Sequence, residues 1–408
     1  MRKMSRKIGV IMCVLSTAMV VFYCVTDRAS LWIDKPSTKN TVDEKQRAVT
    51  SYKQNGEFGV NTKGERRKNN ANIKVEIIMF KKTNGTELQY VLPDATFRTF
   101  DFHDPGQVAL FQRKAIEARY YSLPKTKVNH IDHKLIITGR HICDLESPYL
   151  LIVVPSVPSH ADIREVIRST IGSFGKYRDQ TVHGLNIAVP FSVKLVFVLG
   201  RNGDALTDLA VRNESHSYGD ILQADFVESY YNLTRKMLVT LKWVSVYCSE
   251  IDYMLKLDED VFVNIPVLVH YLRTFRYTTK GSIHGHINWE SPVRRLGKWA
   301  VKWSEFPLTQ YPNYAVGNSY VISGNIIPRM FRASEYLPYM PIEDAFVTGI
   351  LGKIVEAEKV HNDGFTYWLD SKPVPCAFAA SGKISATKVS SSLMKDLWNA
   401  CISFQNFC

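Results

Sequence analysis

Three mainly apolar runs constrain the fold of this chain most strongly. They are Tyr149–Val154, Val193–Leu199 and Tyr253–Leu257, and segments with helical character lie between them, from about 161 to 171 and from about 228 to 248. Strands that are apolar at every position, rather than at alternate positions, are typical of parallel strands buried on both faces. The order of strands and helices therefore predicts an α/β fold with a mostly parallel central sheet.

The N-terminal segment Ile8–Thr26 contains no charged residue, and four Lys or Arg residues stand among the first seven. Its 19 residues just suffice to span a bilayer. The basic flank predicts a cytosolic N-terminus and a luminal remainder. A cleaved signal peptide is the alternative, but the bulky residues from 20 to 25 favour an uncleaved anchor. We expect a cytosolic tail at 1–7 and a transmembrane signal anchor at 8–26 of a single-pass type II protein.

The remaining chain divides into a stem and a folded domain. Residues 27–146 begin as a polar, lysine-rich stretch and then contain apolar patches without clear periodicity, which predicts a luminal stem with an accessory layer. Residues 147–408 are the predicted folded domain. With 408 residues, 45% of them hydrophobic, the chain is long enough for one large domain or two ordinary ones. The formal net charge of +12 does not indicate nucleic acid as a partner, because no zinc-finger or RNA-binding signature accompanies it.

Cysteines and glycosylation sequons agree with a luminal domain. Two of the seven cysteines fall in the expected anchor, and five follow it: Cys143, Cys248, Cys376, Cys401 and Cys408. In an oxidising compartment this odd number predicts one or two disulfides and one thiol that is free or paired between chains, with the connectivity left open. Three sequons for N-glycosylation begin at Asn84, Asn213 and Asn232.

The acidic triplet Asp258-Glu259-Asp260 directly follows the apolar run Tyr253–Leu257. The carboxyl end of a strand is where α/β folds bind ligands. Two carboxylates one residue apart can hold Mn²⁺ or Mg²⁺, and the metal can neutralise charge on a departing nucleoside diphosphate. A polar turn is the alternative, but three neighbouring acids repel one another unless a cation compensates them.

A second acidic pair, Glu343-Asp344, precedes another apolar run. If Phe346–Val355 is a helix, both carboxylates lie at its N-terminus, where the helix dipole favours negative charge. An N-cap role is therefore one interpretation. The other is a general base for a sugar hydroxyl, which requires that the carboxylate face the metal site.

Seven segments, taken in order, resemble motifs of the inverting β1,3-galactosyltransferase family, which also contains β1,3-N-acetylglucosaminyltransferases and Fringe-like enzymes. The resemblance extends from about 149 to about 370. The family's usual tryptophan in the first motif is replaced by Ile171. The segments are Ile163–Gly172, Phe197–Gly200, Glu214–Ile221, Asp225–Lys236, Lys256–Asn264, Lys302-Trp303 with Tyr311–Ser323, and Glu343–Gly349.

The resemblance implies a GT-A-type, Rossmann-like nucleotide-sugar-binding domain. It implies transfer of galactose, or of an N-acetylhexosamine, from a UDP-sugar to a glycan acceptor on a glycoprotein or glycolipid. UDP-galactose is the expected donor, Mn²⁺ or Mg²⁺ the expected cofactor, and the lumen of the Golgi the expected location.

The same resemblance implies roles for individual residues. Asp260 would be the principal metal ligand, Asp258 would contact the ribose or the metal through water, and Asp344 would be the base, with Glu343 beside it. The nucleotide-sugar would contact Arg168, Asp220, Lys236, Asp258 and Glu259. The donor sugar and acceptor would contact Lys302, Trp303, Tyr320 and Gly317. Residue type alone would leave Arg168 and Lys302 as solvated charges and Trp303 and Tyr320 as core or strand aromatics.

The C-terminal segment departs from the family pattern. The family commonly carries a metal-binding histidine before a final tryptophan that resembles Trp398, whereas no histidine follows His361 here and Gly382 or Lys383 stands in that segment. His361 is the candidate substitute ligand, or else a surface histidine, and Lys383 is a candidate cation for the diphosphate. A second hypothesis is a family member without turnover, acting as a luminal glycan-binding or chaperone-like protein.

Overall fold

The computed structural model describes residues 81–82, 87–91, 97–101, 105–144, 147–176, 192–275 and 279–408. The chain divides into two units, Met1–Ile73 and Lys74–Cys408, and every described residue belongs to the second. The expected anchor at 8–26 and the sequon at Asn84 lie outside the described residues. Within the described ranges, no helix has both the length and the apolar character needed to cross a bilayer.

A small antiparallel sheet and one long helix come first in the described chain. The sheet has the order β1-β2-β3, with β1 at Lys81–Lys82, β2 at Glu87–Val91 and β3 at Phe97–Asp101. Helix α3 (Pro105–Tyr121) follows it. These elements belong to the segment in which the sequence predicts an accessory layer.

The main sheet has eight strands in the order β12-β10-β11-β8-β5-β6-β7-β4. Strand β5 pairs in parallel with β6 and β8, β6 pairs in parallel with β7, and β10 pairs in parallel with β12, whereas β11 and the edge strand β4 are antiparallel to their neighbours. The predicted α/β fold with a mostly parallel sheet is confirmed. The strands are β4 (Leu135–Ile137), β5 (Leu150–Pro155), β6 (Val193–Arg201), β7 (Ile221–Val227), β8 (Tyr253–Leu257), β10 (Ser282–Asn288), β11 (Tyr314–Ser323) and β12 (Glu358–His361).

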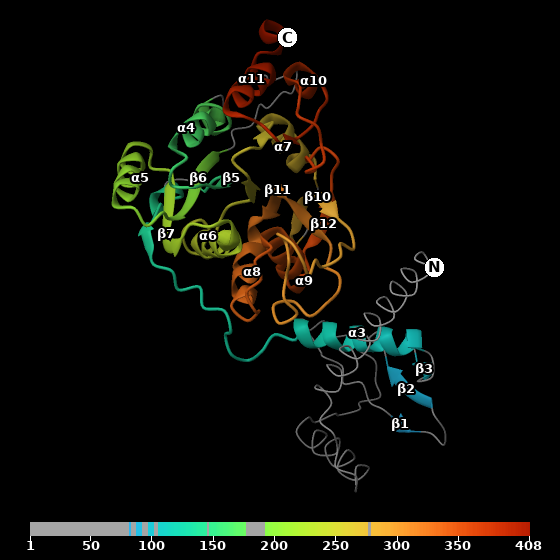
Figure 1. The fold of residues 1–408 in the computed structure, drawn as a ribbon. Helices are drawn as coiled ribbons and strands as arrows, with labels where there is room; N and C mark the ends of the chain where they lie inside the picture. The colour runs from blue at the N-terminus through green and yellow to red at the C-terminus, as the bar shows by residue number, and fades with distance from the viewer. Residues whose placement is uncertain are drawn as a thin grey trace, which may run out of the picture. The chain divides into compact units, whose positions relative to one another are not determined.

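Helices cover both faces of this sheet, which explains why the central strands are mainly apolar rather than alternating. Along β5, Leu150 and Ile152 enter one core cluster and Leu151 and Val153 enter another, so successive side chains are buried on opposite faces. Figure 1 shows α4, α7 and α11 on one side of the sheet and α6 and α8 on the other. The helices are α4 (Ala161–Ser169), α5 (Ala205–Tyr218), α6 (Leu233–Tyr247), α7 (Ile265–Thr274), α8 (Ile327–Ser334) and α11 (Ser391–Ile402).

Short elements complete the domain. A two-stranded antiparallel sheet joins β13 (Ser385–Ala386) to β9 (Phe262–Val263), directly after the acidic triplet. The helix expected from 346 to 355 is the π-helix η5 (Ala345–Leu351) continued by α9 (Gly352–Ile354). The others are η1 (Arg140–Ile142), η2 (Ile171–Lys176), η3 (Tyr230–Asn232), η4 (Gly324–Ile326), α10 (Pro375–Ala380) and α12 (Phe404–Phe407).

Two disulfides, Cys143–Cys248 and Cys376–Cys408, leave Cys401 as a buried free thiol, as the odd cysteine count predicts. The first disulfide lies near β4, a strand of the main sheet that precedes residue 147. The sheet therefore begins before the predicted domain boundary at 147. The sequence did not predict β4 because this strand is too short and too mixed in polarity.

Candidate active site

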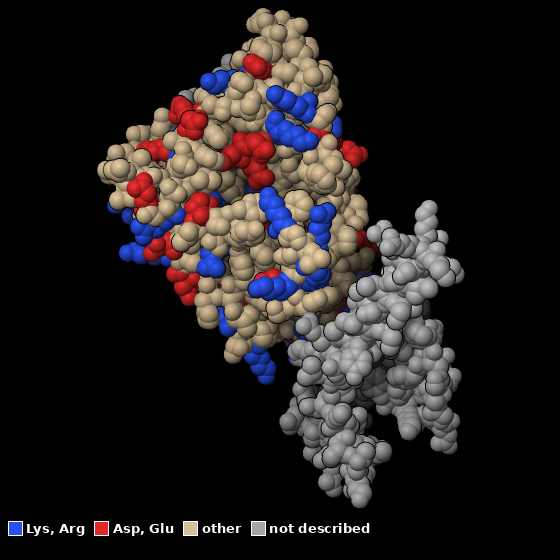
Figure 2. Space-filling view, viewed as in Figure 1, with Lys and Arg blue, Asp and Glu red and all other residues tan. Residues whose placement is uncertain are grey.

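The predicted acidic residues meet at one edge of the main sheet. Strands β5, β6, β7 and β8 are parallel, and β10 runs in the same direction as β8 because both are antiparallel to β11. Their carboxyl ends and the start of β11 therefore share an edge. Figure 2 shows acidic side chains gathered beside a hollow in the middle of the face in view, with Lys and Arg side chains above and below.

The turn after β8 presents Asp258 and Asp260 in different ways. The Asp258 backbone N–H donates to the Asn318 carbonyl at 3.0 Å, and its Oδ1 accepts from Lys256 Nζ at 2.5 Å. Asp260 is exposed, and its carboxylate accepts no hydrogen bond from another side chain within the described residues. Partial burial and the neighbouring Asp258 carboxylate raise the pKa of Asp260. A cation beside these two carboxylates would relieve that repulsion.

Glu259 is turned toward the protein. Its Oε1 accepts from Ser156 Oγ at 2.5 Å, and its Oε2 lies 2.8 Å from His160 Nδ1. Both partners belong to the loop that follows β5. Glu259 therefore joins two loops of the chain and fixes the acidic turn against the end of β5, and its contact with a nucleotide stays a prediction.

Lys256 connects the two acidic sites, and the sequence interpretation missed it. It is fully buried on β8, and its ammonium group contacts Asp258 Oδ1, the Gly317 carbonyl at 2.5 Å and Glu343 Oε2 at 3.8 Å. Burial lowers the pKa of Lys256, but the carboxylates of Asp258 and Glu343 offset this, so the net shift is upward. A lysine inside an otherwise apolar strand is the sequence signal that could have identified it, since buried charges are almost always paired.

The acidic pair before η5 is held by β11. Tyr320 Oη donates to Glu343 Oε1 at 2.6 Å, and burial raises the pKa of Glu343 to about 7. Asp344 accepts from the backbone N–H of Gly317 at 3.0 Å through Oδ2 and from that of Ala345 at 2.8 Å through Oδ1. Burial raises the pKa of Asp344 as well. Asp344 thus caps the helix and also lies next to Gly317, so the N-cap and base interpretations are compatible.

The other predicted nucleotide contacts are engaged in internal ion pairs. Arg168 forms a bidentate pair with Asp220 at 2.7 and 2.9 Å and a third bond with Glu214. Lys236 is buried and donates to Glu228 at 2.8 Å and to the Ser156 carbonyl at 2.7 Å. The Lys236 bonds join the residues that follow β5 and β7, whereas Asp220, the partner of Arg168, precedes the start of β7. The contact of these side chains with a nucleotide stays a prediction.

The long loop between β10 and β11 carries two Lys-Trp pairs, and the sequence interpretation singled out the second. The Trp303 ring is half exposed and lies under the Arg295 guanidinium at 3.6 Å, while Lys302 is exposed. The first pair instead contacts the loop after β7: Trp299 Nε1 donates to Tyr230 Oη at 3.1 Å, and Lys298 Nζ lies 4.4 Å from the Tyr230 ring. The same dipeptide signal could have identified this pair.

His361 lies next to a different set of potential metal ligands from the set that the sequence predicts. Among the described residues, its potential metal-ligating neighbours are His286 and Asp363, not Asp258 or Asp260. His361 Nδ1 accepts from the Ile287 N–H at 3.0 Å, so Nε2 carries the proton and donates to Asp363 at 2.9 Å. Neither nitrogen has a free lone pair. The expectation that His361 completes the metal site with Asp260 is corrected, because β12 is separated from β8 by β10 and β11.

Gly382 and Lys383 are likewise displaced from the acidic turn. Lys383 Nζ donates to the Asp363 carbonyl at 3.3 Å, on the His361 side. The C-terminal segment that reaches Asp260 lies a few residues later: the Val389 N–H donates to the Asp260 carbonyl at 3.0 Å, and Thr387 Oγ1 accepts from Asn318 at 2.9 Å. The expected role of Lys383 as a diphosphate cation is not supported by these contacts.

The donor set of the turn fits a hard divalent cation. Asp260 offers both carboxylate oxygens and Asp258 the one that Lys256 leaves free, and oxygen ligands are those that Mg²⁺ and Mn²⁺ prefer. Such ions commonly keep water and substrate phosphate oxygens in their remaining positions. A site with one or two protein carboxylates and no histidine is an ordinary one for such an ion.

The sequons at Asn213 and Asn232 differ in surroundings. Asn213 is exposed on α5, whereas Asn232 Nδ2 donates to the Val227 carbonyl at 2.8 Å. Glycosylation at either position stays a prediction.

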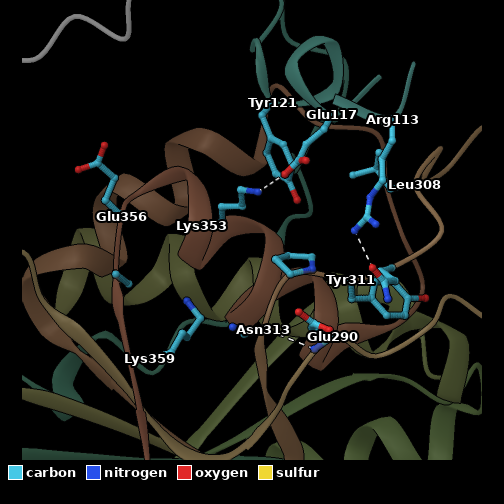
Figure 3. Close-up of a pocket in the computed structure, with 13 residues that line it drawn as sticks. Arg113, Glu117, Tyr121, Glu290, Leu308, Tyr311, Asn313, Lys353, Glu356 and Lys359 are labelled. Atoms are coloured by element: carbon cyan, nitrogen blue, oxygen red, sulfur yellow. Dashed lines mark hydrogen bonds and ion pairs between the residues drawn. The ribbon is translucent and has the colours of Figure 1, made fainter. Parts of the chain in front are cut away.

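A cavity of about 460 Å³ lies between α3 and the loop that leads into β11 (Figure 3). Salt bridges and hydrogen bonds across it join Glu117 to Lys353 and Arg113 to Gln310. Its lining contains neither Asp258 nor Asp344, so it is separate from the acidic edge.

The known proteins that this chain resembles in sequence are galactosyltransferases. The family model described as Galactosyltransferase matches residues 162–363. The chain is 34% identical over 226 residues to β1,3-galactosyltransferase 5 of Pan paniscus, covering 54% of this chain and 70% of the relative. It is 28% identical to β1,3-galactosyltransferase 1 of Homo sapiens, covering 67% and 79%. A solved active-site mutant of LgtC aligns with a TM-score of 0.34 and 12% identity, over 60% of this chain and 94% of that one.

Proposed function

The chain belongs to the β1,3-galactosyltransferase family and is a hexosyltransferase, and from this premise we propose that it transfers galactose from UDP-galactose to a glycan hydroxyl with inversion at the anomeric carbon. The main support for this proposal is that the acidic turn and Asp344 are arranged around the buried ammonium group of Lys256. Lys256 contacts Asp258 directly and reaches Asp344 through the backbone of Gly317. These contacts fix the position of Asp258, on the donor side, relative to Asp344, the proposed base.

Asp344 is suited to remove the proton of the attacking hydroxyl. Burial raises its pKa, which makes the carboxylate a stronger base than an exposed aspartate, and two backbone N–H groups fix its orientation. In the proposed step, Asp344 accepts the hydroxyl proton while the oxygen bonds to the anomeric carbon and the bond from that carbon to the UDP oxygen breaks. Attack on the face opposite UDP converts a UDP-α-sugar into a β-linked product.

We propose that Asp258 and Asp260 hold Mn²⁺ or Mg²⁺. A cation there neutralises negative charge on the departing diphosphate. The chain's own contribution is to keep the two carboxylates at the strand end: Lys256 binds one oxygen of Asp258, and the Val389 N–H binds the Asp260 carbonyl. The sequence also supports a single-pass type II location in the Golgi membrane, with the anchor at 8–26 and the catalytic domain in the lumen.

A donor and acceptor screen tests the proposal. The full chain is incubated with UDP-galactose, UDP-GlcNAc or UDP-GalNAc, Mn²⁺ and a panel of glycans, and UDP release and product linkage are measured. We expect a β1,3-linked product from UDP-galactose. Absence of transfer from all three donors would contradict the proposal and favour the glycan-binding hypothesis.

A further inference from the structure

Five aromatic rings form a continuous run at the ends of β10 and β12, which we call the aromatic rim. Successive ring centroids lie 6.5 Å apart for Trp289 and His361, 4.9 Å for His361 and His286, 4.5 Å for His286 and Tyr367, and 5.6 Å for Tyr367 and Trp368. The rim continues the sheet edge that carries the acidic turn, on its β10–β12 side.

The two tryptophans at the ends of the rim are exposed. Trp289 exposes 56% and Trp368 50% of its surface, whereas Trp243 and Trp398 are buried elsewhere in the domain. Exposing an indole forgoes the stabilisation that burial of a large apolar ring gives. Exposed tryptophans gathered at a functional edge are typical of ligand-binding surfaces.

The rim lies where an acceptor must approach. The strands β5, β6 and β7, whose ends the nucleotide is expected to contact, are on one side of β8, and β11, β10 and β12 are on the other. The attacking hydroxyl comes from the face opposite the leaving UDP, so the acceptor belongs on the β10–β12 side. Tyr314 connects the rim to the base: it accepts from Asn288 at 3.1 Å, and burial, with Asp344 and Tyr367 nearby, raises its pKa.

Polar groups accompany the rings. The Asp363 side chain is almost fully exposed and binds the His361 Nε2–H, and Lys383 reaches the Asp363 carbonyl. Flat apolar faces combined with carboxylate and amine groups match a sugar, which has apolar C–H faces and hydroxyl edges. A metal ion fits less well, because the Ile287 N–H occupies Nδ1 of His361 and the proton occupies Nε2.

We propose that the aromatic rim binds the sugar that precedes the acceptor sugar, so that the preferred acceptor is an oligosaccharide of neutral hexose or N-acetylhexosamine units. This inference rests on the proposed function, because it takes the direction of acceptor approach from Asp344. The rim would stack one face of this sugar on Trp289 or Trp368, and Asp363 would accept hydrogen bonds from its hydroxyls.

The kinetic test compares Trp289→Ala and Trp368→Ala with wild type. Acceptors are the methyl glycosides of galactose and N-acetylglucosamine and disaccharides that end in the same sugars. We expect KM for the disaccharide to rise at least fivefold in each variant, with KM for UDP-galactose and for the monosaccharide unchanged. Tyr247→Ala is the matched control, because this exposed ring ends α6 at the opposite edge of the sheet. Equal changes for both acceptors, or none, would overturn the proposal.

Binding without turnover separates this inference from the proposed function. Saturation-transfer NMR of the disaccharides is recorded on wild type and on Trp289→Ala. If wild type transfers nothing but binds the disaccharide through Trp289, the rim stands and the proposed function fails. If the disaccharide binds both proteins equally, the rim is overturned. Tight Zn²⁺ binding to wild type that His361→Ala abolishes would also overturn it, in favour of a metal site.

Discussion

The backbone N–H of Gly317 donates a 3.0 Å hydrogen bond to Oδ2 of Asp344, and a Cβ at position 317 would lie 3.3 Å from the same oxygen. Gly317→Ala should therefore displace the carboxylate by a few tenths of an ångström. We expect kcat to fall about tenfold with little change in KM for the donor, because small misplacements of a catalytic group are costly. Steady-state kinetics and a thermal melt measure this, and wild-type kcat would show that the close approach is unimportant.

Lys256→Met tests the buried cation. The substitution leaves the Glu343 and Asp258 carboxylates without their shared partner, and breaking a buried ion pair in this way costs about 3–5 kcal/mol. We expect a clear fall in Tm. The double variant Lys256→Met with Glu343→Gln removes one stranded charge and should recover part of that loss. If the single variant melts like wild type, Lys256 does not hold the two sites together.

Removal of metal tests the acidic turn. EDTA should abolish transfer and Mn²⁺ should restore it, and Asp260→Asn should raise the Mn²⁺ concentration for half-maximal activity at least tenfold, because it removes one of two carboxylate ligands. Glu259→Gln is the matched control within the same turn, since its carboxylate contacts Ser156 and His160. Its Mn²⁺ dependence should equal that of wild type. Full activity in EDTA would contradict the metal assignment.

The pH dependence of stability tests Glu343. Burial raises its pKa from 4.5 to about 7 in the folded protein, so folded molecules bind more protons than unfolded ones between these values. The stabilising contribution is complete below about pH 4.5 and is lost as the pH rises through about 7. We expect the Tm difference between wild type and Glu343→Gln to change across this window in the direction that disfavours wild type at higher pH. A constant difference would contradict the assigned pKa.

The central strands could be predicted from the sequence because burial on both faces leaves a continuous apolar signal. Strand β8 has the predicted bounds, Tyr253–Leu257. Strand β10 gives no such signal, because it contains the polar residues Ser282 and His284. Both are buried in the folded sheet, where their side chains form a 2.7 Å hydrogen bond with each other. The apolar pattern therefore predicted the central strands β5, β6 and β8 better than β10 and β12.

The acidic residues of the site could be located from the sequence, but their connections could not. Consecutive acids beside apolar runs identify the turn and the Glu343-Asp344 pair. The contacts of Lys256 with Gly317 and Glu343 join residues that are far apart in the sequence, and they depend on the pairing of β8 with β11. A histidine side chain suggested that His361 is a metal ligand. The strand order places β10 and β11 between its strand and β8, the strand that precedes Asp260.

The assignment of Asp344 as the base is tested most directly by the turnover rate of Asp344→Asn, together with the anomeric configuration of the wild-type product. Wild type, Asp344→Asn and Glu343→Gln are incubated with UDP-galactose and an acceptor, and product is followed by NMR of the anomeric proton while a thermal melt verifies folding. We expect a β-linked product from wild type and at least a hundredfold loss of kcat in Asp344→Asn, which keeps its fold. Turnover by folded Asp344→Asn near the wild-type rate, or an α-linked product from wild type, would contradict it.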